Sequence, residues 1–70
     1  MHAINSSIYM KTKLTISNGT FFCEVMPTWI KVYEASREEA DEIVARYGAK
    51  HNIRYRVQEI TEDYIKYLAI

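Results

Sequence analysis

The dipeptide Asn18-Gly19, which stands between two runs of alternating apolar and polar residues, is the feature that most constrains the fold. Both residues tolerate the positive φ of a type I′ turn, so the pair predicts a tight β-hairpin. A two-residue loop also fixes the register, and it places Leu14 opposite Cys23. The aliphatic residues of both strands then share one side of the hairpin, because side chains alternate between the two faces of a strand.

Further segments continue the pattern of strands. The four segments predicted as strands are Tyr9–Ser17, Thr20–Met26, Trp29–Glu34 and Ile53–Glu59. Pro27 has no N–H and cannot donate a hydrogen bond to a neighbouring strand. In the predicted strand before Pro27 the alternating apolar residues stand at odd positions, and in the one after it they stand at even positions. We therefore expect a bulge or a break at Pro27-Thr28, which leaves either one bent strand or two strands.

A helix is predicted to follow these strands. Ser36-Arg37-Glu38-Glu39 fits a capping box, in which side chains bond the free N–H groups of the first turn. An apolar stripe at helical spacing comes next, and it comprises Ala40, Ile43, Val44 and Tyr47. Gly48 is placed to end the helix with a left-handed cap.

Two expectations complete the fold. Because Trp29–Glu34 and Ile53–Glu59 flank the helix, they predict a β-α-β crossover. Thr61 and the acids after it predict a short C-terminal helix with a stripe of Tyr64, Ile65 and Leu68. The predicted fold class is α+β, with a small sheet of three to four strands, one main helix on one face and the short C-terminal helix.

The length of 70 residues predicts a single domain, in which residues 1–8 form a loose N-terminal extension. Cys23 is the only cysteine, so no internal disulfide can form, and a reducing cytoplasm is the expected setting. No run of residues reaches the length of a membrane span. Small scaffolds usually need a staple or a partner, so we expect a homo-oligomer or a bound protein.

Charge is expected to separate onto two faces of the folded chain, which has nine basic and nine acidic residues and no net charge. Basic and aromatic side chains, with Met26, are expected to gather on the open face of the sheet and bind a partner. These candidate residues are Lys11, Lys13, Phe22, Met26, Trp29, Lys31, Tyr33, Arg54 and Arg56, with Tyr9 as a further ring. A second, acidic partner surface is expected on the helix, at Glu38, Glu39, Asp41 and Glu42.

Catalytic chemistry is not predicted. The two glycines have structural roles, so the sequence has no glycine-rich phosphate loop, and His2 and His51 lie far apart. The acids of the helix are expected to face solvent, whereas general acid–base catalysis needs a shielded pair. We therefore expect no enzyme, no metal and no cofactor.

Three readings of the basic and aromatic face remain open. Tryptophan, tyrosine and arginine dominate binding hot spots, which favours a protein-binding module. Cations interleaved with rings also suit nucleic acid, although the sequence pI of about 6.7 lies below that of dedicated nucleic-acid domains. In the structural reading, strand lysines and arginines only prevent edge pairing, and a bend at Pro27 turns Trp29 and Phe22 into the core.

In kind, the chain resembles the small single-domain proteins of phages and mobile elements that bind and inhibit a host complex, anti-CRISPR proteins among them. The resemblance rests on the short length, the absence of catalytic motifs, the lone cysteine and the compact run Ile30–Ile60. It implies an inhibitor that acts by occlusion, and no residue role carries over from it.

Overall fold

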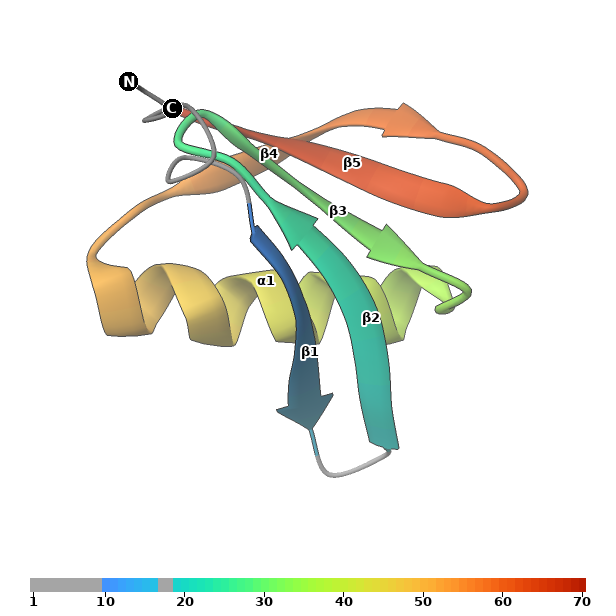
Figure 1. The fold of residues 1–70 in the computed structure, drawn as a ribbon. Helices are drawn as coiled ribbons and strands as arrows, with labels where there is room; N and C mark the ends of the chain where they lie inside the picture. Colours follow the sequence, from blue (N-terminus) through green and yellow to red (C-terminus); the bar gives the residue numbers. More distant parts are fainter. Residues whose placement is uncertain (1–9, 17–18) are drawn as a thin grey trace, which may run out of the picture.

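The computed structural model of the chain describes residues 10–16 and 19–70, and the side chains of all of these except Met10, Lys11 and Ile16. One sheet and one helix make up this part of the chain (Figure 1). The elements are β1 (Met10–Ile16), β2 (Gly19–Val25), β3 (Trp29–Tyr33), α1 (Arg37–His51), β4 (Tyr55–Ile60) and β5 (Tyr64–Ala69). The predicted N-terminal extension lies outside the described residues.

The sheet has five strands in the order β1-β2-β3-β5-β4, and every neighbouring pair is antiparallel. The prediction of three to four strands is therefore wrong. The predicted β-α-β crossover is present, because β3 and β4 are both antiparallel to β5 and therefore run parallel, although they are not neighbours. The last strand β5 inserts between them and pairs with both, so α1 connects two strands that are separated by a third.

The C-terminal helix is the largest error of the sequence prediction, because residues 64–69 form β5. In this strand Ile65 and Tyr67 are buried, whereas Tyr64 and Lys66 lie on the other face, which is the period of a strand. Thr61 does not begin a helix. Its hydroxyl accepts from the N–H groups of Asp63 and Tyr64, and its own N–H donates to the carbonyl of Tyr64 at 2.8 Å. Thr61 therefore closes the β4–β5 hairpin.

The N-terminal hairpin forms with a register two residues away from the predicted one. Leu14 lies opposite Phe21 rather than Cys23, and Gly19, predicted in the turn, belongs to β2 and pairs with Ile16. A shift of two residues keeps every side chain on its predicted face. Leu14 and Phe21 accordingly pack against the core, and Cys23 and Val25 are buried.

The break at Pro27 is confirmed, and it produces two strands. Met26 donates its N–H to the carbonyl of Trp29 at 2.9 Å, which closes a tight turn between β2 and β3. Val25 then pairs with Ile30, and both side chains point to the core. Trp29 is left on the opposite face, so the bend does not turn it inward.

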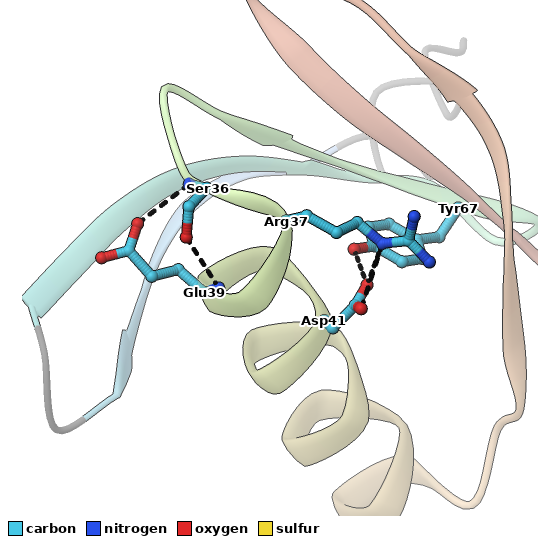
Figure 2. Close-up of polar contacts among 5 residues, drawn as sticks. All are labelled: Ser36, Arg37, Glu39, Asp41 and Tyr67. Carbon is cyan, nitrogen blue, oxygen red and sulfur yellow. Dashed lines mark hydrogen bonds and ion pairs between the residues drawn. The ribbon is translucent and has the colours of Figure 1, made fainter.

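The capping box of α1 is confirmed. The hydroxyl of Ser36 accepts from the N–H of Glu39 at 3.1 Å, and the N–H of Ser36 donates to the Glu39 carboxylate at 2.9 Å (Figure 2). The predicted end of the helix is wrong, because α1 continues past Gly48 and is capped by Asn52 at φ 60°. Gly48 is buried inside the helix.

The core lies between α1 and one face of the sheet, and no helix of the described residues covers the other face (Figure 1). Its buried members are Cys23, Val25, Ile30, Val32, Ala40, Ile43, Val44, Ile65 and Tyr67. The predicted stripe of the helix supplies three of them. No helix in the described part of the chain is long and apolar enough to span a membrane.

The buried thiol of Cys23 makes the free energy of unfolding depend on pH in the alkaline range. Burial raises the pKa of Cys23 from 9.0 to about 11, because the thiolate would lose its hydration. The unfolded thiol ionises from about pH 9, whereas the folded thiol stays protonated, so the free energy of unfolding falls as the pH rises from 9 to 11. We expect urea denaturation at pH 8, 9 and 10 to show this decline. Cys23→Ala should make the decline smaller, with the remainder due to tyrosines whose pKa is also raised in the fold. An equal decline in the variant would contradict the assignment.

Candidate binding surface

The open face of the sheet carries aromatic and basic side chains from four neighbouring strands. Cross-strand partners lie on the same face of a sheet, so the register identifies its members. Those whose side chains are described are Lys13 and Thr15 on β1, Thr20, Phe22 and Glu24 on β2, Trp29, Lys31 and Tyr33 on β3, and Tyr64, Lys66 and Leu68 on β5. Arg56 and Glu59 continue the face onto β4. We call this set the open face.

Three rings form a row across the middle of the open face. The ring centroids of Phe22 and Tyr33 are 5.8 Å apart, and those of Tyr33 and Tyr64 are 5.7 Å apart, with tilted planes in both pairs. Such pairs stabilise a surface beyond the area that they bury. Phe22 is still 41% exposed, which is unusual for a large apolar side chain.

Two carboxylates fix the tyrosines of this row. Tyr33 donates its hydroxyl to Glu24 at 2.6 Å, and Tyr64 donates to Glu59 at 2.9 Å. The hydrogen bond to Glu59 raises the pKa of Tyr64, so the Tyr64 hydroxyl stays protonated as the donor at neutral pH. The rings are thereby oriented before any partner arrives.

Two lysines lie directly opposite each other beside the row of rings. Lys31 on β3 pairs with Lys66 on β5, and like charges in that position repel. Trp29 lies beneath both, with the Lys31 Nζ 5.2 Å and the Lys66 Nζ 4.9 Å from its ring centroid. The Lys31 Nζ is also 4.4 Å from the Tyr64 ring centroid. Cation–π attraction draws both ammonium groups to the same ring, and these two positive charges form a candidate site for an anionic group.

Most of the predicted partner residues lie on this face. Lys13, Phe22, Trp29, Lys31, Tyr33 and Arg56 are brought together, and exposed Arg54 precedes β4 on the same side by alternation. Met26 lies half-buried in the turn between β2 and β3. The side chain of Lys11 and the whole of Tyr9 lie outside the described residues.

Sequence reasoning missed the contribution of β5. Tyr64, Lys66 and Leu68 were assigned to a helix, so they could not be placed beside Trp29. The signal that identifies them is the alternation of these residues with Ile65, Tyr67 and Ala69, which has the period of a strand.

The predicted acidic surface of the helix is largely engaged within the molecule. Glu39 belongs to the capping box, and Glu42 pairs with Arg46 at 3.3 Å. Asp41 accepts from the Arg37 Nε at 2.9 Å and from the Tyr67 hydroxyl at 2.5 Å (Figure 2). Burial, aided by the bond to Asp41, raises the pKa of Tyr67, so this bond ties α1 to β5 at neutral pH. Of the predicted acidic set, Glu38 is the most open to solvent.

No group of three or more histidine, cysteine or acidic side chains that could hold a metal ion occurs within residues 10–16 and 19–70. No protein-family model, no curated protein and no solved structure matches the chain. The chemistry of the open face is therefore the basis for a functional proposal.

Proposed function

We propose that this chain is a non-enzymatic protein-binding module whose open face docks on an acidic surface of its partner. The single observation that carries the proposal is the cross-strand pair Lys31 and Lys66, whose ammonium groups lie 5.2 Å and 4.9 Å from the Trp29 ring centroid. A carboxylate of a partner placed between the two ammonium groups relieves their repulsion and gains two charge-assisted hydrogen bonds. The neighbouring rings then supply apolar contact around that charge.

The composition of the open face supports a hot spot of binding. Trp29 is the kind of anchor that dominates interfaces, and its position is fixed by the two lysines. The tyrosines are held by carboxylates, so little conformational freedom is lost on docking. A face whose side chains are held in place before docking acts by covering its partner's surface, which supports an inhibitor or adaptor that works by occlusion.

Nucleic acid is the second candidate, because the described cations of the open face outnumber its carboxylates. Against this reading, single strands bind by stacking bases on free ring faces. The Lys31 Nζ already lies over both Trp29 and Tyr64, and that of Lys66 also lies over Trp29. A base would have to displace these lysines, whereas a carboxylate would not. The chain also has no net positive charge.

The test is capture of a partner by the tagged protein, followed by affinity measurement with the purified partner. We expect Trp29→Ala and Lys66→Glu each to weaken binding at least about tenfold, because truncation of a hot-spot residue costs more than about 1 kcal/mol and reversal adds repulsion. Glu38→Ala and Lys50→Ala, on exposed parts of the helix, are the matched controls and should bind as the parent does. Urea denaturation of each variant verifies that it is folded.

Salt and nuclease separate the two candidates. Phosphate neutralisation makes nucleic-acid affinity fall by orders of magnitude between 50 and 200 mM salt, whereas a protein interface of this kind should lose far less. Binding that disappears after nuclease treatment would favour the nucleic-acid reading. Folded open-face variants that bind like the parent protein would remove both readings.

A further inference from the structure

A groove runs along α1 on the side that faces β4, away from the open face. Its volume is about 670 Å³. The helix residues that line it are Arg37, Asp41, Val44, Ala45, Gly48, Ala49 and Asn52, which form one side of α1 from its first turn to its cap. At 1.5 Å per residue, this distance is about 22 Å. The groove is therefore elongated, and small residues on the helix, Ala45 and Ala49, keep it open.

Strand β4 bounds the groove, and it is also an edge of the sheet. Tyr55 and Val57 line the groove, and β4 is the last strand in the order on that side. The carbonyl of Arg54 accepts from the N–H of Ile70 on the β5 side at 2.8 Å. Hydrogen bonds alternate along an antiparallel pair, so the backbone groups of Tyr55 and Val57 point away from β5, toward the free edge.

We propose that this edge binds an extended peptide segment of a partner, in which acidic and apolar side chains alternate. The segment adds to β4 as a sixth strand and bonds the N–H and C=O groups of Tyr55 and Val57. Its side chains on the groove side pack against Tyr55, Val57, Ala45 and Ala49. This site uses the β4 edge and the groove beside α1, and of the open face it shares only Arg54 and Arg56. It therefore does not depend on the lysine pair that carries the proposed function.

Charge complementarity selects the acidic residues of that segment. Side chains on the other side of the added strand lie opposite Arg54 and Arg56, which are exposed and make no ion pair within the described residues. The one carboxylate that lines the groove, Asp41, is already engaged by Arg37 and Tyr67. The charged side chains without an ion pair at this part of β4 are thus positive. Acidic side chains of the peptide opposite them would stabilise its pairing with β4, because opposite charges across neighbouring strands attract.

The irregularity of β4 limits the length of the added strand. The register shifts between Val57 and Glu59, so regular pairing ends there. The segment therefore spans about four residues opposite 54–57. The other edge strand, β1, borders a smaller hollow of about 300 Å³ that includes Arg46, Lys50 and His51. Peptide binding at β1 is therefore the internal comparison for binding at β4.

The experiment is selection of a displayed library of random twelve-residue peptides on the complete chain, followed by NMR of the isotope-labelled protein with the enriched peptides. We expect enrichment of alternating acidic and apolar residues. The amide signals of Tyr55 and Val57 should shift, and their hydrogen exchange should slow at least tenfold. Methylation of alternate peptide nitrogens, which removes the strand-pairing donors, should weaken binding at least tenfold.

A matched pair of variants tests the groove. Ala49 is exposed, so both Ala49→Glu and Ala49→Gln should leave the fold intact, and NMR spectra verify this. We expect Ala49→Glu to weaken binding of an acidic peptide several-fold more than Ala49→Gln does, because only the former adds a negative charge. Failure of any peptide to enrich, shifts confined to β1, β2 and β3, or unchanged binding of the methylated peptide would overturn the proposal.

Discussion

Replacing Ile43 by alanine is expected to remove most of the stability of this fold. Ile43 lies on the inner side of α1 and is 1% exposed, among the largest fully buried side chains. A buried isoleucine truncated to alanine costs about 2–5 kcal/mol, from lost transfer energy and from the cavity that remains. A domain of this size has a free energy of unfolding of only several kcal/mol, roughly 0.05–0.15 per residue.

The helix has a particular importance here because α1 is the only element that covers the core side of the sheet in the described part of the chain. Without its attachment, the buried side chains of β2, β3 and β5 would face water. Urea denaturation followed by circular dichroism measures the change. The matched control is Ile60→Ala, the same substitution at a side chain that is 58% exposed on β4, where we expect less than about 1 kcal/mol. Equal losses in the two variants would contradict this account of the core.

The parts of the fold that could be predicted are those in which local chemistry decides the structure. The capping box at Ser36 is one, since the two side chains that form it lie within one turn. The break at Pro27 is another, because proline has no N–H for a ladder wherever the chain goes. The prediction of which side chains of the first hairpin point to the core was also correct, since it depends only on the alternation of apolar and polar residues along each strand.

The errors occurred where one local sequence pattern is compatible with two different structures. The Asn18-Gly19 pair indicated the hairpin but not its register, which differs from the predicted one by two residues. Thr61 was ambiguous in the same way. A threonine hydroxyl that accepts from the N–H groups two and three residues ahead can begin a helix or close a turn. The strand partner β3, distant in sequence, decides between them, because only an extended β5 fills the gap between β3 and β4.

The candidate surface depended on this same decision. The residues predicted on β2 and β3 lie on the open face, because the alternation of side chains along these strands was predicted correctly. Their most informative neighbour, Lys66, could not be found, since its position opposite Lys31 exists only when residues 64–69 are a strand. The paired lysines over Trp29 are a property of strand order, which is not a local property of the sequence.

Gly48 is the second position at which a large effect is expected, and here helix propensity and packing predict opposite signs. Gly48 lies inside α1, where alanine would favour the helix by about 1 kcal/mol. However, a Cβ atom at this position would lie 2.3 Å from the carbonyl oxygen of Ile53. That oxygen belongs to the backbone, so it cannot move like the end of a flexible side chain.

The close approach of Ile53 to Gly48 is fixed by hydrogen bonds in the segment that connects α1 to β4. The carbonyl of Gly48 accepts from the N–H of Asn52, the left-handed cap, and from the N–H of Ile53 at 2.8 Å. Moving Ile53 away to admit a methyl group would stretch these bonds and displace Tyr55, whose ring lies 3.4 Å from the same Cβ position. Packing therefore outweighs propensity.

We expect Gly48→Ala to lower the free energy of unfolding by about 1–3 kcal/mol or more, the range for overpacked sites. Urea denaturation measures the loss, and NMR should show the largest shifts at Ile53 and Tyr55. Ala45→Gly, at an exposed position of the same helix, is the control for propensity and should cost about 1 kcal/mol. If Gly48→Ala instead raises stability, propensity governs the site, and the tight return from α1 to β4 does not require a glycine.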